Sequence, residues 1–233
     1  MEPQANSQFS PRLPFPNRLF RWLFALIWFV LFRVKVTGKE NIPKGNCIIV
    51  ANHLSWIDHV LLLTVIPAEP RPYLLGAAQS IASPFKAWLF NTFGGVVSVE
   101  RGAAWVGKDA LRAPIRVLES GAILGIFPEG EAGREEGQLL PFKRGVGHIV
   151  LRADYPILPI ALSGVQDLYW RKEILVTIGA PFRVQVEGLD HHAAIGAAMS
   201  QVEAALRATL PIYREPVVAR KPLHFLSNLA DRL

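Results

Sequence analysis

The chain has 233 residues, of which 51% are hydrophobic and 19% are charged, and its formal net charge is +6. The apolar excess excludes an intrinsically disordered chain, and the length fits one domain with a large core. The single cysteine, Cys47, excludes a disulfide framework and a cysteine-based zinc cluster. The mean hydropathy of +0.26 is high for a soluble protein and favours a surface that meets a membrane.

The positive charge is concentrated near the N-terminus. Residues 1–35 contribute +4 of the net +6, from five basic residues and one acidic residue. No motif of a nucleic-acid-binding domain is present in the sequence, so we expect no nucleic-acid partner. A basic and aromatic terminus suits an anionic membrane surface better, because cations are attracted to headgroups and apolar rings settle at the interface.

Residues 1–33 contain the most apolar stretch of the chain and are predicted to be a membrane-associating helical segment. The uncharged run within them, residues 22–32, would make about 16 Å of helix, whereas the hydrocarbon core of a bilayer is roughly 30 Å thick. Simple spanning is therefore not expected, and the small-residue cleavage site of a signal peptide is missing. We expect a monotopic protein at the cytoplasmic face of the inner membrane.

Three side chains of this segment, Arg21, Trp22 and Trp28, favour a position at the headgroups, where arginines snorkel and tryptophan rings settle. A helix buried in the core is the alternative. If the segment only anchors the protein, a chain that starts at Val34 should stay folded and lose most of its binding to anionic liposomes. If such a chain aggregates, the segment belongs to the core.

Residues 34–210 are predicted to form one catalytic domain, followed by a tail at residues 211–233. Short β-branched and apolar runs bounded by glycine or proline indicate strands, and longer periodic runs indicate helices. Their alternation predicts an α/β fold whose sheet is covered by helices on both faces. The expected strands are residues 34–37, 47–51, 73–75, 96–100, 123–127, 157–162 and 174–178. The expected helices are residues 56–66, 81–93, 105–119 with a kink at Pro114, 145–153 and 192–210.

The densest polar cluster, residues 52–59, follows a buried strand, and active groups often lie in the loop after the carboxyl end of a strand. Ser55 is predicted to cap the helix that follows, with Asp58 in its first turn. His53 lies just before this cap and can fold back onto Asp58. The carboxylate would then fix the tautomer of the imidazole, which makes His53 a general base. No serine nucleophile elbow follows, so His53 would act directly on a substrate hydroxyl.

Metal ligation is the alternative for this cluster, because His53, Asp58 and His59 are all possible ligands. Their spacing does not match the H-x-H-x-D-H pattern of hydrolases, since serine stands at position 55. The remaining histidines are scattered and lie in no HExxH motif. We therefore expect no metal.

Five short segments occur in a fixed order between residues 35 and 180. A histidine and an aspartate five positions apart are a weak signal alone, and the order of all five segments makes them specific. The segments are Asn52-His53-x4-Asp58, GVVSVER at residues 95–101, FPEG at 127–130, PFKRG at 141–145 and ILPI at 157–160. Together they resemble the glycerolipid acyltransferase family.

This resemblance implies a single α/β domain with a central mixed β-sheet, like that of glycerol-3-phosphate acyltransferase. It implies transfer of a fatty acyl group from acyl-CoA or acyl carrier protein to the free hydroxyl of a lysophospholipid. The best candidate for the acceptor is 1-acyl-sn-glycerol 3-phosphate, which would give phosphatidic acid in phospholipid biosynthesis. The expected partners are membrane lipids, the lysophospholipid and the acyl donor. No cofactor is expected, because the thioester is already activated.

His53 and Asp58 are the catalytic candidates, His53 as the base on the acceptor hydroxyl and Asp58 as the group that orients it. By resemblance, Arg101 binds the phosphate of the acceptor, and Glu129 with Gly130 positions the acceptor. The remaining substrate-binding candidates are Asn52, Phe127, Pro128 and, near the phosphate, Lys143.

The loop after FPEG departs from the family pattern, which usually continues with threonine, arginine and serine. Here residues 131–136 are EAGREE, and Arg134 is the candidate for the missing arginine. Three alternatives stay open: a lysoglycolipid or another lipid alcohol as the acceptor, hydrolysis of lipid thioesters, and a non-catalytic membrane-binding module of the same fold. The presence of both His53 and Asp58 disfavours the non-catalytic module.

Overall fold

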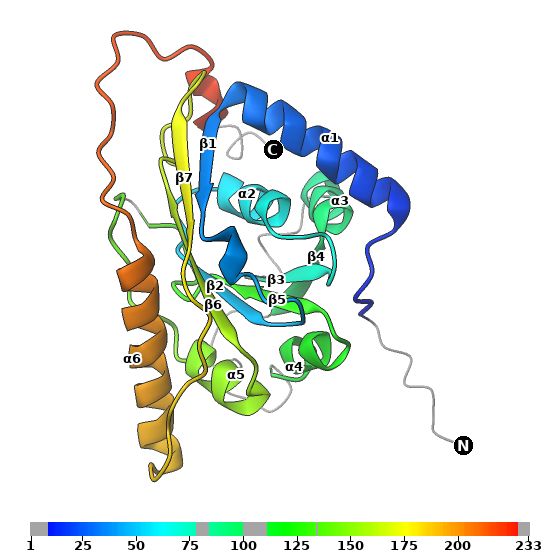
Figure 1. The fold of residues 1–233 in the computed structure, drawn as a ribbon, viewed down its shortest axis with the longest axis vertical. Helices are drawn as coiled ribbons and strands as arrows, with labels where there is room; N and C mark the ends of the chain where they lie inside the picture. Colours follow the sequence, from blue (N-terminus) through cyan, green and yellow to red (C-terminus); the bar gives the residue numbers. More distant parts are fainter. Residues whose placement is uncertain (1–8, 78–83, 100–110, 134, 228–233) are drawn as a thin grey trace.

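The computed structural model describes residues 9–77, 84–99, 111–133 and 135–227. Within these residues, seven strands form a mixed sheet in the spatial order β1-β7-β6-β2-β5-β3-β4 (Figure 1). β6 and β7 pair antiparallel, and the other neighbouring strands pair parallel. The strands are β1 (Arg33–Thr37), β2 (Ile48–Ala51), β3 (Pro72–Ala77), β4 (Gly95–Val99), β5 (Ile123–Ile126), β6 (Ile157–Ser163) and β7 (Glu173–Ile178).

Helices cover both faces of the sheet (Figure 1). On one face lie α2 and α3, and α1 crosses over them on the outside. On the other face lie α4, α5 and α6. The helices are α1 (Phe15–Leu31), α2 (Ile57–Val65), α3 (Pro84–Phe93), α4 (Arg112–Glu119), α5 (Gly145–Ala153) and α6 (His191–Thr209), with a short 3-10 turn η1 (Lys39–Asn41) after β1.

The central strands are buried on both faces, because alternate side chains point into two separate hydrophobic cores. In β2, Ile49 and Ala51 pack with residues of α2 and α3, whereas Ile48 and Val50 pack with residues of α4, α5 and α6. All four side chains are fully buried. A strand covered on both faces needs a continuous apolar run, which is what the sequence has here.

The predicted fold class is confirmed, and each expected strand and helix has a counterpart. The expected helix starts at residues 81 and 105 and the expected strand end at residue 100 lie outside the described residues. The expected kink at Pro114 is wrong, because Pro114 stands in the first turn of α4, where its missing N–H costs nothing. The turn η1 was missed; it begins after Gly38, whose φ of 75° is a conformation that glycine adopts without strain.

One face of α1 packs on the domain. The guanidinium of Arg21 is buried and donates to the carbonyl oxygen of Phe93, at 2.8 Å, and to that of Ile66. These carbonyls stand at the ends of α3 and α2, where helical carbonyls lack partners. Trp28 is also buried and contacts Phe32, with ring centroids 4.3 Å apart. The expected headgroup position of Arg21 and Trp28 is therefore wrong.

The buried face of α1 also changes the expected result of truncation. Phe32, at the end of α1, is fully buried, and Phe24 lies edge-to-face on Phe93 at 4.7 Å. A chain that starts at Val34 would open this part of the core, so we now expect it to unfold or aggregate. In the described part of the chain, no helix is long and apolar enough to cross a membrane.

Candidate active site

Two adjacent strands bring the candidate residues together. β2 ends at Ala51 and leads into Asn52 and His53, and β5 ends at Ile126 and leads into residues 127–130. Because β2 and β5 are parallel neighbours, both loops leave the same edge of the sheet. The carboxyl ends of these strands therefore form the floor of the candidate site.

The predicted contact between His53 and Asp58 is present. Nδ1 of His53 lies 2.8 Å from Oδ2 of Asp58, whose side chain is fully buried. The same Oδ2 accepts hydrogen bonds from the backbone N–H groups of Leu54 and Ser55, at 2.5 and 2.7 Å. Because Oδ2 is a hydrogen-bond acceptor, the contact holds the proton of the neutral imidazole on Nδ1. Nε2 is then left as a proton acceptor on a ring whose side chain is 15% exposed.

The predicted cap at Ser55 is wrong. α2 begins at Ile57, Trp56 takes the N-cap position, and no side-chain oxygen caps the first turn. Ser55 takes part through its backbone N–H, which donates to Asp58. Asp58 therefore orders the loop as well as the imidazole, and both functions use one oxygen.

Asn52 ties this loop to the neighbouring strand. Its side-chain amide donates to the carbonyl oxygen of Leu162 at 2.9 Å and accepts from the N–H of Leu162 at 2.7 Å. Leu162 belongs to β6, which pairs with β2. Both polar atoms of this buried amide are thus hydrogen-bonded to the backbone of β6. Because Asn52 directly precedes His53, these bonds help to position His53.

Glu129 holds the same loop from the other side. Its Oε1 accepts from the N–H of His53 at 3.0 Å, and its Oε2 accepts from the N–H of Leu140 at 2.8 Å. Its side chain is fully buried, and burial raises the pKa of Glu129 although both N–H groups oppose this shift. The carboxylate expected to position the acceptor thus lies against the backbone of the candidate base.

Phe127 and Pro128 shape the wall beside the imidazole. The ring of Phe127 lies 4.7 Å from that of His53. Pro128 accepts a hydrogen bond from the N–H of Lys143 at 2.8 Å, which joins the FPEG and PFKRG segments. Gly130 has a φ of 70°, and a Cβ there would come within 3.1 Å of the side chain of Lys143.

Lys143 is a cation at the rim of this wall. Its Nζ lies 3.2 Å from an oxygen of Glu131, and both side chains are exposed. An exposed pair of this kind contributes little to stability, so the ammonium group is free to exchange partners. Arg101 and Arg134, the other two candidates for the phosphate, lie outside the described residues.

His59 lies next to the candidate base, His53. From the sequence, His59 was considered only as a possible metal ligand. Its ring lies 5.0 Å from that of His53 and 4.7 Å from that of Phe127. Burial lowers the pKa of His59 to about 3, and the nearby His53 adds to this effect. His59 is therefore neutral at physiological pH. Among the described residues, no three His, Cys, Asp or Glu side chains gather in a way that could hold a metal.

The family of the chain follows from comparison with known proteins. A family model described as acyltransferase matches residues 33–163, more than half of the chain, and this range includes the residues around His53, Glu129 and Lys143. The chain belongs to the acyltransferase family.

Two curated relatives carry more specific names. The 1-acyl-sn-glycerol-3-phosphate acyltransferase alpha of Homo sapiens is 30% identical over 149 residues, which cover 63% of this chain and 51% of that protein. The 1-acyl-sn-glycerol-3-phosphate acyltransferase of Borreliella burgdorferi is 28% identical over 171 residues, 70% of this chain and 64% of that protein. The chain spans about half the length of the human relative.

A solved structure has the same fold. The crystal structure of the 1-acyl-sn-glycerophosphate (LPA) acyltransferase PlsC from Thermotoga maritima matches with a TM-score of 0.62. The match covers 83% of this chain and 78% of that chain at 24% identity. At this identity the likeness establishes the architecture alone.

Proposed function

We propose that this protein transfers a fatty acyl group from a thioester donor to the free hydroxyl of 1-acyl-sn-glycerol 3-phosphate, which gives phosphatidic acid. The observation that carries the proposal is the contact of His53 with the buried carboxylate of Asp58 in a chain of the acyltransferase family. The names of the human and Borreliella relatives support this choice of acceptor.

In the proposed reaction, Nε2 of His53 takes the proton of the acceptor hydroxyl while the oxygen attacks the carbonyl carbon of the thioester. Asp58 stabilises the imidazolium that forms. The C–S bond then breaks, and the sulfur leaves as a thiol with the proton from His53. Acyl-CoA and acyl carrier protein both fit as donors, and an activated thioester needs no metal or prosthetic group.

We propose that the phosphate of the acceptor binds beside this base. Lys143 lies at the rim of the wall formed by the FPEG segment. Of the cations predicted to bind the phosphate, it is the one that lies within the described residues. Arg101 is the proposed second cation. A phosphate between them would hold the glycerol backbone so that its free hydroxyl reaches Nε2 of His53.

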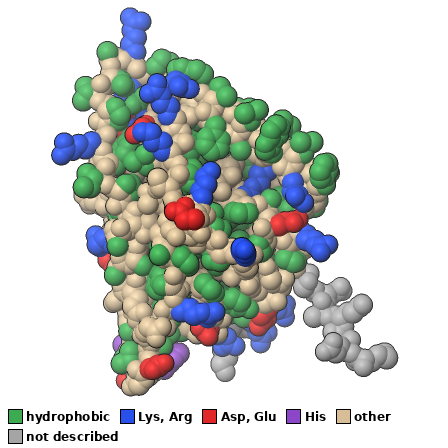
Figure 2. Space-filling view, in the orientation of Figure 1, with side chains coloured by type: hydrophobic (Ala, Val, Ile, Leu, Met, Phe, Trp, Pro, Cys, Tyr) green, Lys and Arg blue, Asp and Glu red, His purple; other side chains and the backbone are tan. Residues whose placement is uncertain are grey.

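The outer face of α1 is the proposed membrane contact, at the cytoplasmic side of the membrane. Large apolar side chains stand exposed along it, among them Phe15, Trp22, Leu26 and Ile27. Figure 2 shows these hydrophobic side chains along the upper right edge of the molecule, with basic side chains near both ends. A lysophospholipid is held in a bilayer, so an enzyme that acts on it gains from lying at that surface.

The proposal is tested by mixing the protein with a radiolabelled acyl donor and a panel of acceptors. We expect label in phosphatidic acid when 1-acyl-sn-glycerol 3-phosphate is present, and much less when the acceptor lacks the phosphate. Label in free fatty acid alone would mean thioester hydrolysis. Equal transfer to a lysoglycolipid would mean that the phosphate is not recognised.

A further inference from the structure

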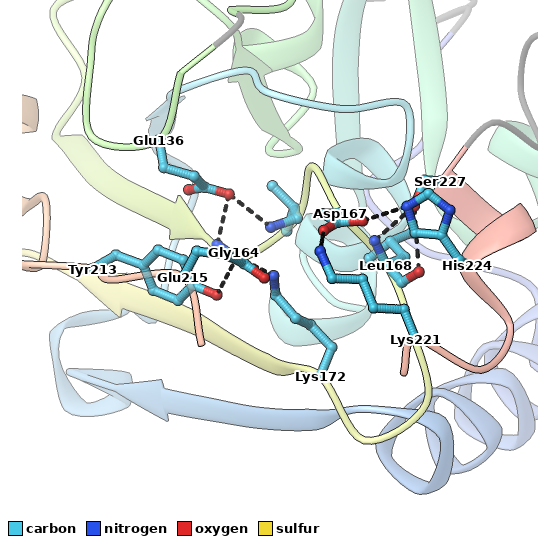
Figure 3. A network of polar contacts seen from close by, with 11 residues as sticks. Glu136, Gly164, Asp167, Leu168, Lys172, Tyr213, Glu215, Lys221, His224 and Ser227 are labelled. Atoms are coloured by element: carbon cyan, nitrogen blue, oxygen red, sulfur yellow. Dashed lines mark hydrogen bonds and ion pairs between the residues drawn. The ribbon is translucent and has the colours of Figure 1, made fainter. Parts of the chain in front are cut away.

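After α6 the chain returns to the domain, and its last described residues, 224–227, lie near the end of α1 (Figure 1). We call residues 211–227 the C-terminal segment. It runs along the connection between β6 and β7, residues 164–172, and several polar contacts hold it there (Figure 3). These contacts decide which of its side chains face the protein and which face outward.

The first fastening is an ion pair between a buried lysine and an exposed glutamate. Lys172 has a fully buried side chain, and its ammonium group pairs with Glu215 of the C-terminal segment. The same ammonium lies 5.0 Å from the ring centre of Tyr169 and 5.6 Å from that of Tyr213. A buried ammonium without a partner is strongly destabilising, so the segment cannot leave without exposing this group.

The second fastening lies near the end of the segment. Asp167 pairs with Lys221 and with Nε2 of His224, the latter at 2.5 Å. The hydroxyl of Ser227 accepts from the N–H of Leu168 at 2.7 Å and donates to its carbonyl oxygen at 3.3 Å (Figure 3). Both ends of the described C-terminal segment are therefore fixed to one connection.

With the C-terminal segment held in this way, some apolar side chains of the region are buried and others are exposed. Leu226 packs against the core, and its carbonyl oxygen accepts from the indole N–H of Trp56 at 3.3 Å. Leu223 and Phe225 instead stand exposed, together with Trp170 of the β6–β7 connection. We call Trp170, Leu223 and Phe225 the C-terminal apolar cluster. Leu223 has a φ of 65°, a strained conformation for leucine, and its side chain is still 38% exposed.

The β6–β7 connection, which carries Trp170 of the cluster, is joined to the end of α1. The N–H of Arg171 donates to the carbonyl oxygen of Leu31 at 2.7 Å, and the N–H of Arg33 donates to that of Lys172 at 2.8 Å. The connection that carries Trp170 is thus joined to the last turn of α1, where Val30 is exposed. Three arginines next to these contacts in sequence, Arg33, Arg171 and Arg220, are exposed.

We propose that the C-terminal apolar cluster is a second contact with an anionic bilayer, beside the outer face of α1. The mixture of exposed aromatic and aliphatic side chains with arginines suits the headgroup region, where rings settle and cations meet lipid phosphates. The proposal rests on the membrane location given in the proposed function. It places the bilayer against α1, Trp170 and residues 223–225, and the ion pair of the buried Lys172 with Glu215 helps to hold the C-terminal segment on the domain.

Site-specific labelling tests the contact in the full-length protein. Burial raises the pKa of the single native Cys47 thiol to about 12, so it reacts poorly with a maleimide dye. An environment-sensitive dye is attached to Phe225→Cys and, as the matched control, to Leu189→Cys, an exposed leucine just before α6. Vesicles of phosphatidylglycerol and phosphatidylcholine are the probe. We expect a blue shift and brighter emission at position 225 and no change at position 189.

Four outcomes would overturn the proposal. They are no change at position 225 while the vesicles bind the protein, equal changes at both positions, no binding to the vesicles at all, and a change that follows protein concentration without lipid. The last outcome would mean that a second copy of the chain covers the cluster.

A double variant measures how much the cluster contributes to vesicle affinity. Leu223→Ser with Phe225→Ser removes apolar area without touching the fastenings, and it should weaken vesicle binding by about 10-fold. Leu189→Ser should bind as the unchanged protein does. Acyl transfer to detergent-dispersed acceptor should stay unchanged in the double variant. If no protein transfers acyl groups but the double variant still loses vesicle binding, the proposed activity fails and the membrane contact stands.

Discussion

The His53 site and the outer face of α1 differ in where their side chains find partners. Around His53, oxygens of Asp58 and Glu129 accept hydrogen bonds from backbone N–H groups of the same chain. On the outer face of α1, side chains such as Trp22 and Ile27 stand exposed, with nothing in the described chain over them. The oxygens that hold His53 in place thus find partners within the chain, whereas the side chains on the outer face of α1 are exposed.

This difference shows what each region is built to do. Fixed hydrogen bonds hold an imidazole in one tautomer before a substrate arrives, which lowers the cost of reaching the transition state. Exposed apolar side chains along the outer face of α1 suit the membrane contact that we propose for it. The two regions meet through α1, whose inner face packs on the helices that flank the site.

The largest effect is expected from Asp58→Asn, which tests whether the carboxylate orients His53. The amide cannot hold the proton of His53 on Nδ1 as a carboxylate does, and we expect a loss of about 10²- to 10⁴-fold in turnover. Acyl transfer measured at saturating acceptor checks this. Ser55→Ala is the control, because Ser55 contributes its backbone N–H to the loop, and its turnover should stay close to that of the unchanged protein. Normal turnover in Asp58→Asn would separate the carboxylate from catalysis.

A second test separates the two faces of α1. Deletion of residues 1–33 should remove several kcal/mol of stability, because burial of Trp28 and Phe32 contributes about 1.5–3 kcal/mol each. We expect an aggregated or unfolded protein by circular dichroism. Trp22→Ser with Ile27→Ser should instead keep the melting temperature and weaken binding to anionic vesicles. A folded, monomeric deletion protein would show that α1 is only an anchor.

The third test concerns Glu129, whose carboxylate holds the backbone of His53. Glu129→Gln places an amide NH₂ against one of the two N–H donors, those of His53 and Leu140, and leaves a buried donor without an acceptor. We expect a loss of about 1–3 kcal/mol in the free energy of unfolding, measured by urea titration. Glu131→Gln is the matched control on the same loop; its pair with Lys143 is exposed and should contribute under about 1 kcal/mol. Equal stabilities of the two variants would contradict this role of Glu129.

The smallest expected effect is a pH dependence of stability. The folded protein holds His59 neutral down to a pKa of about 3, whereas the unfolded chain takes up this proton near pH 6.5. The unfolded state therefore binds more protons between these values, and stability falls as the pH is lowered through this range. Between pH 7 and 5 the loss from His59 is about 2 kcal/mol.

His59→Phe should remove this part of the acid sensitivity. Urea unfolding at pH 7 and pH 5 measures it, and the difference between the two pH values should be smaller in the variant than in the unchanged protein. An identical difference in both proteins would mean that His59 titrates normally in the folded state.

Much of the fold could be predicted from local patterns, and so could the main contact of the site. The apolar run of β2 marks a strand buried on both faces, and the four residues between His53 and Asp58 allow the chain to fold back within one loop. Both are short-range features. The alternation of strands and helices then limits the architecture to a few arrangements.

The remaining features depend on contacts between distant parts of the chain. Arginine is usually exposed, so the sequence alone suggests a surface position for Arg21. Its hydrogen-bond partners, Ile66 and Phe93, lie 45 and 72 positions away. The oxygens of Glu129 meet the N–H of His53, 76 positions earlier, so the sequence shows an acid after a strand and cannot show where it points. Lys172 and Glu215 pair across 43 positions, which is why residues 211–233 were expected to be only a tail.

The central claim is that His53, oriented by Asp58, removes the proton of the acceptor hydroxyl. The most direct measurement is the single-turnover rate of acyl transfer to 1-acyl-sn-glycerol 3-phosphate by His53→Ala, with a folded protein confirmed by its melting temperature. We expect a rate about 10²- to 10⁴-fold below that of the unchanged protein at every pH tested. A rate equal to that of the unchanged protein would contradict this claim.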